Sequence, residues 1–148
     1  AGGNLNAVRE MLEHPSSRLG LSDAGAHLET LADASLFTFM LTHWARDREN
    51  GIPLPSIVKM MTSEPAEIFG LEDRGRIAPG YRADLNVIDY SNLEVGVPWL
   101  ENDVPGGGSR LLQKPDGYQH TFVAGVATFV DGRPTGELPG RLIRRGSS

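Results

Sequence analysis

The chain has 148 residues, of which 39% are hydrophobic and 22% charged, a composition typical of one globular domain and unlike that of a disordered tail. A formal net charge of −5 gives no electrostatic reason to bind nucleic acid or an anionic membrane, and no stretch approaches the roughly 20 apolar residues of a membrane-spanning helix. The sequence contains no cysteine, which excludes disulfides and thiolate chemistry within these residues and agrees with the cytoplasmic location that we expect.

The first half of the chain is predicted to be mainly helical. Apolar residues recur at helical spacing in four segments, at residues 5–13, 34–49, 55–61 and 64–69. Asp33 is expected to cap the long second helix, and Asn50 and Gly51 to stop it in the left-handed conformation. Between the first two helices, residues 18–22 form a short apolar run that predicts a buried strand. Helices around a strand indicate an α/β fold.

Beyond residue 75 the pattern changes to short strands separated by turns rich in glycine and proline. Four segments are predicted as strands, at residues 76–78, 84–89, 121–123 and 126–130. Pro79–Gly80 predicts a type II turn between the first two strands, and Ala124–Gly125 a two-residue hairpin between the last two. A glycine triplet at residues 106–108 is assigned to a long polar loop. This half is therefore predicted to be a small antiparallel β unit.

Neither half is predicted to be complete by itself. One strand flanked by helices cannot make a sheet, and four short strands cannot make a sandwich with two covered faces. The chain also begins with Ala1, close to the start of a helix. We therefore expect a partial fold, divided into a helical part at residues 1–74 and a β part at residues 75–148, with most of the fold on sequence outside this chain.

The segment with the clearest chemical potential follows the predicted strand. Asp23 stands at the end of the strand, and His27 follows four positions later. The carboxyl end of a sheet is where α/β proteins place their active sites, and a carboxylate there can bind a metal or act as a general base. The alternative is structural, with Asp23 capping a turn and His27 lying in a surface loop. The spacing alone does not decide between these interpretations.

Two other polar residues are expected to have structural roles. His43 lies among apolar residues of the long helix, where a histidine is usually a hydrogen-bonded packing residue. Asp84, at the entry to a predicted strand, is expected to bind backbone groups. The glycine triplet lacks the lysine and the following helix of a phosphate-binding loop.

Four motifs stand in a fixed order along the chain: residues 22–27 (SDAGAH), 42–47 (THWARD), 62–66 (TSEPA) and 75–85 (GRIAPGYRADL). Together they resemble the C-terminal portion of the amidohydrolase superfamily, in its N-acyl-D-amino-acid deacylase-like (D-aminoacylase-like) branch. The resemblance implies that residues 18–22 are the eighth strand of a (β/α)8 barrel and residues 34–49 its helix. It also implies that the residues from about 75 onward are the C-terminal strands of a small β-sandwich.

The resemblance also implies roles for two residues. Asp23 matches the strand-eight aspartate, which in the family contacts the metal and moves a proton from the attacking water to the leaving nitrogen. His27 matches a position that touches substrate in related cyclic-amide hydrolases. The implied cofactor is a divalent metal, zinc in the first instance, with most of its ligands outside this chain, because the metal-binding histidines of the family belong to earlier strands.

The implied function is metal-dependent hydrolysis of a C–N bond in an amide or cyclic amide, N-acyl-D-amino acids included, by the intact protein. The 148 residues alone are expected to be inactive. The implied partners are a small amide substrate, the remainder of the barrel and a second copy of the protein in a homo-oligomer. The alternative, from a different class, is a non-catalytic assembly module related to amidohydrolases.

One departure from the resemblance concerns the substrate. In the D-amino-acid branch, an arginine in the loop after the strand-eight aspartate clamps the substrate carboxylate, a task suited to a guanidinium. Residues 24–33 contain neither Arg nor Lys. The sequence therefore favours either a clamp from an earlier loop or, by a small margin, a substrate without that carboxylate.

Overall fold

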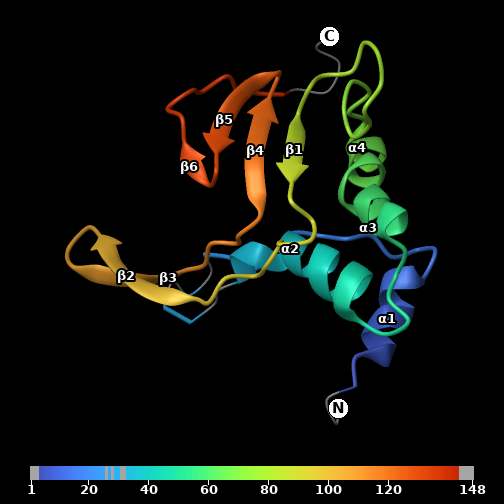
Figure 1. The fold of residues 1–148 in the computed structure, drawn as a ribbon, viewed down its shortest axis with the longest axis horizontal. Coiled ribbons are helices and arrows are strands. Elements are labelled where there is room, and N and C mark those ends of the chain that lie inside the picture. The colour runs from blue at the N-terminus through green and yellow to red at the C-terminus, as the bar shows by residue number, and fades with distance from the viewer. Residues whose placement is uncertain (1–3, 26, 28, 31–32, 144–148) are drawn as a thin grey trace.

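The computed structural model describes residues 4–25, 27, 29–30 and 33–143, and these form a helical part and a β part (Figure 1). The helical part contains α1 (Asn6–Glu13), a long helix in three sections, α3 (Leu54–Met61) and α4 (Ser63–Phe69). The β part contains a four-stranded sheet and a separate two-stranded hairpin. None of the helices in the described ranges is long and apolar enough to cross a membrane.

The predicted long helix forms, but its geometry changes along its length. Its sections are the 3-10 turn η1 (Asp33–Ser35), the α-helix α2 (Leu36–Phe39) and the π-helix η2 (Met40–Asp47). The wide last turn is closed by the Arg48 amide, which donates to the His43 carbonyl, five residues earlier, at 3.0 Å. Asn50 follows with φ 55°, so the predicted left-handed stop is confirmed.

The helix ends differ in part from the predicted ones. Asp33 is the first residue of η1, and the α-helical section begins after Ser35, whose side chain makes no capping bond to the helix. Ser63 is the first residue of α4, one residue before the predicted start at residue 64, and Thr62 takes the cap position. Gly70 ends α4 in the left-handed conformation with φ 65°.

The four-stranded sheet is antiparallel, with strand order β1-β4-β5-β6 (Figure 1). Its strands are β1 (Leu85–Ile88), β4 (Tyr118–Val123), β5 (Val126–Val130) and β6 (Arg133–Pro134). Ala124 and Gly125 have φ of 51° and 79°, the left-handed pair that a type I′ turn requires, so the predicted hairpin is confirmed. Asp131 and Gly132 make the next turn in the same way, with φ of 47° and 68°.

A second hairpin stands apart from the sheet, and the sequence does not predict it (Figure 1). It consists of β2 (Trp99–Val104) and β3 (Gly108–Leu112). Gly106 and Gly107, with φ of 82° and 78°, lie in the hairpin turn, and Gly108 begins β3, so the prediction of a long polar loop is wrong. The register shifts between Glu101 and Val104, which breaks the regular alternation that marks a strand in a sequence.

Two predicted strands do not form within the described residues. Residues 18–22 and 76–78 pair with no described segment, and Leu21 and Ile77 are 86% and 89% exposed. A strand is stable only when a neighbouring strand satisfies its backbone groups, and the local apolar pattern does not supply that neighbour. The predicted α/β class is therefore confirmed only as a mixture of helices and strands, and the barrel and sandwich assignments stay predictions.

The turn at Pro79–Gly80 is present even though the first of its flanking strands is not. The Tyr81 amide donates to the Ala78 carbonyl at 3.1 Å, and Gly80 has φ 84°. A left-handed glycine in the third position is the signature of a type II turn, as the sequence predicts.

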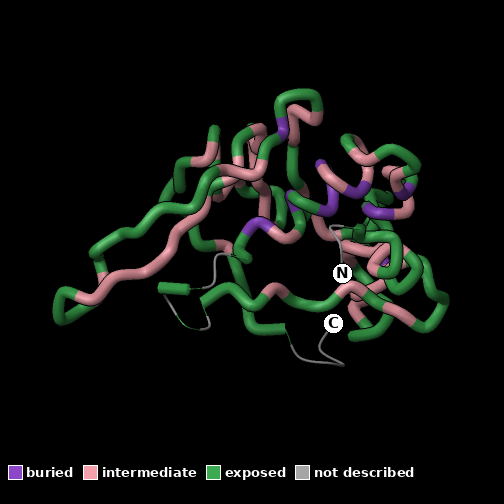
Figure 2. Tube along the Cα trace, turned by 90° about the horizontal axis from the view of Figure 1, so that it is seen from below, coloured by how far each residue is buried: buried purple, intermediate pink, exposed green. Residues whose placement is uncertain are grey.

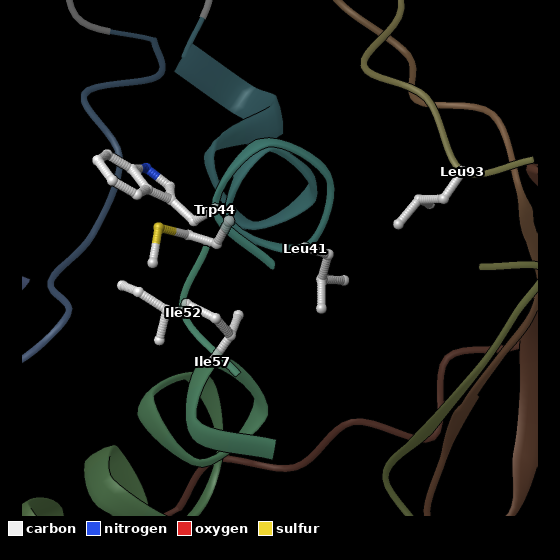
Figure 3. Packing of buried hydrophobic residues seen from close by; sticks show 6 residues of the cluster. Leu41, Trp44, Ile52, Ile57 and Leu93 are labelled. Carbon is white, nitrogen blue, oxygen red and sulfur yellow. The ribbon is translucent and has the colours of Figure 1, made fainter. Parts of the chain in front are cut away.

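The core is small and lies where the long helix meets α3 and the β part (Figure 3). Its buried apolar residues are Met40, Leu41, Trp44, Ile52, Ile57 and Leu93. Most of the chain is half-buried or exposed (Figure 2), and on the long helix Phe37 and Phe39 are 43% and 37% exposed. The described residues therefore cover this helix only in part.

Candidate functional site

Asp23 and His27 lie four residues apart in the exposed segment between α1 and the long helix. The backbone turns at Gly25, with φ 86°, and His27 itself is left-handed, with φ 51°. The His27 carbonyl accepts a hydrogen bond from the Thr30 amide at 2.7 Å, which closes a tight turn. A left-handed residue other than glycine costs about 1–3 kcal/mol, and such residues are frequent at functional sites. The structure thus places both predicted site residues in one short, exposed loop.

The described residues do not by themselves make a metal centre. Among residues 4–25, 27, 29–30 and 33–143, no three or more His, Cys, Asp and Glu side chains lie close enough together to hold an ion. Asp23 offers a carboxylate and His27 an imidazole, both of which are zinc ligands, but a catalytic zinc takes about three protein ligands. A complete centre therefore needs ligands beyond those that the described residues bring together.

The helix that follows the loop is held to the β part by two buried hydroxyl groups. Ser35, 4% exposed, donates a hydrogen bond to Gln113 Oε1. Thr38, 3% exposed, shares a hydrogen bond with the Tyr118 hydroxyl at 3.0 Å. Gln113 Nε2 also donates to the Gly96 carbonyl at 2.7 Å. Because an unpaired buried polar group is costly, these bonds fix the start of the helix relative to the ends of β3 and β4.

Arg46 joins the far end of the same helix to the β part. Its Nη1 donates to the carbonyls of Tyr90 and Leu93, both at 2.8 Å, and its guanidinium lies 5.8 Å from the centre of the Tyr90 ring. Its Nε donates to Asp47 Oδ1 at 2.6 Å, a bond that lowers the pKa of the Asp47 carboxyl and raises the pKa of Arg46. The Tyr90 hydroxyl donates to the Leu41 carbonyl at 3.2 Å, and burial raises the pKa of that hydroxyl.

The sequence does not predict these links between the helix and the β part. Ser35 is 78 residues from Gln113, and Thr38 is 80 from Tyr118. Contacts at such separations leave no periodic signal in the sequence. Only Arg46 gives a weak indication in the sequence that it makes such a contact. It is the first charged residue after a long apolar stretch of the predicted helix, and a charged side chain that is buried there needs a partner.

His43 and Asp84 have structural contacts. His43 stacks on Phe39 with ring centres 4.7 Å apart and meets the edge of Trp44 at 5.1 Å, which confirms it as a packing residue. Its buried Nε2 has no hydrogen-bond partner among the described residues, unlike the prediction. Asp84 Oδ1 accepts from the Ala124 amide at 2.8 Å, the backbone role predicted for it.

Comparison with known proteins gives matches along nearly the whole chain. The model of the amidohydrolase family matches residues 1–135, a range that contains the Asp23 loop and the long helix. The chain is 33% identical over 147 residues to an N-acyl-D-glutamate deacylase from Alcaligenes xylosoxydans xylosoxydans, an alignment that covers 97% of this chain and 27% of that protein. The chain therefore spans about a quarter of the length of that relative.

Solved structures of D-aminoacylases are similar to this chain in fold as well. A D-aminoacylase mutant in complex with CuCl2 matches it with a TM-score of 0.58 and 31% identity, over 74% of this chain and 21% of that one. A D-aminoacylase structure that concerns the enzyme's binuclear metal centre matches with a TM-score of 0.53 and 31% identity, over 68% of this chain and 19% of that one. Both likenesses cover about a fifth of the solved chains.

Proposed function

Because this chain belongs to the amidohydrolase family and is D-aminoacylase-like, we propose that it forms the C-terminal portion of a metal-dependent hydrolase that cleaves a C–N bond. The observation that carries the proposal is the family match over residues 1–135, which includes an exposed loop with both Asp23 and His27. The proposed substrate class is an amide or cyclic amide, and N-acyl-D-amino acids belong to this class.

Asp23 is the proposed catalytic residue. Its carboxylate accepts a proton from the attacking water and returns the proton to the leaving nitrogen, so that one group serves as base and then as acid. Proton transfer by a positioned side chain typically contributes about 10²- to 10⁴-fold to the rate. His27, in the same loop, is the proposed contact to the substrate beside Asp23.

A divalent metal, zinc in the first instance, is the proposed cofactor, and it would polarise the scissile group when bound. The described residues do not complete a metal centre, so Asp23 is proposed as one ligand and the rest as part of the sequence outside this chain. The D-aminoacylase structure concerned with a binuclear metal centre supports this proposal. The remainder of the barrel is the proposed partner that covers the exposed apolar residues of the long helix.

The charge of the loop bears on the choice of substrate. Residues 24–33 contain no Arg or Lys and carry the acidic residues Glu29 and Asp33, which repel a substrate carboxylate. We therefore propose a preference for an amide that lacks this carboxylate. The similarity to an N-acyl-D-glutamate deacylase points the other way, so the two substrate classes need a direct comparison.

The test is an assay of the intact protein on an N-acyl-D-amino acid and on its carboxamide analogue, before and after metal removal and zinc addition. We expect hydrolysis that depends on the metal and is at least as fast with the carboxamide. A preference of about 10²-fold for the acid, near the roughly 3 kcal/mol of a charged hydrogen bond, would contradict the proposed substrate preference. A zinc-loaded intact protein that hydrolyses neither compound would favour the alternative of a non-catalytic assembly module.

A further inference from the structure

The turn after the long helix contains an asparagine followed by a glycine, Asn50 and Gly51. Asn50 is exposed and left-handed, with φ 55°. Gly51 packs so closely that a Cβ at this position would lie 2.6 Å from the Trp44 carbonyl oxygen. Asparagine is enriched among the non-glycine residues with left-handed φ, and position 51 has no room for a side chain. The fold itself therefore favours an Asn–Gly pair at this turn.

Asn50 differs from the other asparagines of the chain in its side-chain contacts. Among the described residues, only its main-chain carbonyl is bonded, by Arg9 Nη1, and its side-chain amide has no partner. The five other asparagines each have a hydrogen-bonded side chain, and none of them precedes a glycine: Asn4, Asn6, Asn86, Asn92 and Asn102. The Asn50 side chain can therefore turn toward the next peptide bond without breaking a contact to a described residue.

The amide nitrogen of Gly51 is the group closest along the chain that can react with this side chain. Within the part of the chain that the structure describes, this amide donates to no acceptor, whereas the nearby amides of Arg48 and Ile52 donate to main-chain carbonyls at 3.0 Å and 2.7 Å. Glycine has no side chain to hinder the approach. The end of a helix also frays more readily than its middle, which gives the backbone the freedom that ring closure needs.

We propose that Asn50 and Gly51 form a site of spontaneous deamidation. The Gly51 nitrogen attacks Cγ of Asn50 and forms a C–N bond, while the bond between Cγ and Nδ2 breaks. Ammonia leaves with the former amide proton, and a five-membered succinimide ring remains. Water then opens the ring at one of its two carbonyls and leaves aspartate or isoaspartate at position 50. The reaction needs only water, and Asp23 takes no part in it.

Isoaspartate at position 50 changes the main chain directly after the long helix. It transfers one methylene group from the side chain into the main chain, which lengthens the connection to Gly51. Ile52, only 1% exposed, lies one residue further on, and its amide donates to the Trp44 carbonyl at 2.7 Å. A longer connection displaces this buried residue of the core, so the modified protein should be less stable.

The experiment keeps the intact, folded protein at mildly alkaline pH, which favours attack by the amide, and a second sample at mildly acidic pH. Trypsin releases residues 49–59, a peptide whose one asparagine is Asn50. Exchange of an amide for a carboxylate changes the peptide mass, and the acidic sample measures the conversion that the digestion itself causes. The control variant is Asn50→Gly, because glycine keeps the left-handed stop of the helix and has no carboxamide.

We expect Asn50 to convert at least about tenfold faster than any of the five other asparagines. Each of those must first break a hydrogen bond, a delay of about 2- to 13-fold, and each is followed by a residue with a side chain. The melting temperature of the wild-type protein should fall during the alkaline incubation, and that of Asn50→Gly should not.

Two results would overturn the inference. One is conversion at Asn50 that is no faster than at the other asparagines of the chain. The other is full conversion at Asn50 with an unchanged melting temperature, which would show that the modified turn does not disturb the core.

Discussion

His27 combines an exposed imidazole with a left-handed backbone in the loop that also carries Asp23. The structural alternative from the sequence, a plain surface residue in a turn, accounts for the exposure and for the backbone, because histidine is among the residues enriched at left-handed φ. The contact to the substrate that we propose concerns the imidazole itself. The backbone conformation and the chemistry of the side chain can be tested separately, because asparagine also tolerates left-handed φ.

The substitution that separates them is His27→Asn in the intact enzyme. If the imidazole contributes one hydrogen bond to the substrate, about 0.5–1.5 kcal/mol, KM should rise roughly 2- to 13-fold while kcat changes less. Steady-state kinetics measures both constants. An unchanged KM would assign His27 to the turn alone.

Among the secondary-structure elements, the β2–β3 hairpin shows how charge supports an exposed element. Arg110 donates to both carboxylate oxygens of Asp103, from Nε at 2.7 Å and from Nη2 at 2.5 Å. The hydrogen bond from Arg110 lowers the pKa of the Asp103 carboxyl. Since the pKa is lower in the folded state, the stabilisation is present above the unfolded value, about 3.9, and is lost as pH falls through the folded value.

Arg110→Gln should therefore raise the pKa of Asp103 toward its ordinary value. An NMR titration of the carboxyl group measures the change. Arg76→Gln is the control, because Arg76 pairs with Glu67 on α4 and should leave the pKa of Asp103 as it is. A pKa of Asp103 that does not move in Arg110→Gln would show that the ion pair is absent in solution.

The chain just before β4 depends on one glycine. Gly117 has φ 99°, and a Cβ at this position would lie 2.8 Å from the Cα of Leu93 in the buried core. Gly106 has a similar φ of 82°, but its Cβ would meet no atom within 4 Å. Both positions therefore require a positive φ, but only Gly117 is closely packed against another part of the chain.

Gly117→Ala should destabilise the intact protein more than Gly106→Ala. The left-handed conformation costs about 1–2 kcal/mol in both, and only position 117 adds the clash with the Leu93 backbone. Denaturant unfolding of the two variants measures the difference. Equal losses of stability would mean that the close approach to Leu93 is absent.

For the molecule as a whole, the small core leaves much apolar surface open. Phe37, Phe39 and Phe69 are 43%, 37% and 71% exposed, while the buried cluster comprises few residues. This agrees with the partial fold that the sequence predicts, because the long helix carries many apolar residues and the chain offers little to cover them. The remainder of a barrel is our proposed cover.

The isolated 148 residues should therefore expose a contiguous apolar patch larger than the few hundred Å² of an ordinary monomer. We expect them to bind a hydrophobic dye and to self-associate, as measured by dye fluorescence and sedimentation. A cooperative thermal transition of a monomer without dye binding would count against a partial fold.

Sequence and structure agree where the signal is local. The helical periodicity predicts all four helical segments, and Ala124–Gly125 predicts its hairpin, because these features depend on neighbours along the chain. Residues 18–22 need a neighbouring strand that the described residues do not supply, so they form no strand here and their place in a barrel stays a prediction. The β2–β3 hairpin has a shifted register, and its local pattern does not predict it. The same holds for the candidate site. The segment with Asp23 can be identified from neighbouring residues in the sequence, whereas the contact between Ser35 and Gln113, 78 residues apart, cannot.

The central claim is that Asp23 transfers the proton from the attacking water to the leaving nitrogen. The most direct test compares the substitution of Asp23 with that of a second acidic residue in the same segment, Glu29. In the intact, metal-loaded enzyme, Asp23→Asn and Glu29→Gln each remove one negative charge from an exposed side chain. We predict that Asp23→Asn, compared with wild type at equal metal content, lowers kcat by about 10²- to 10⁴-fold, and that Glu29→Gln stays within about threefold of wild type. Turnover of Asp23→Asn within a few-fold of wild type, at equal metal content, would contradict the account.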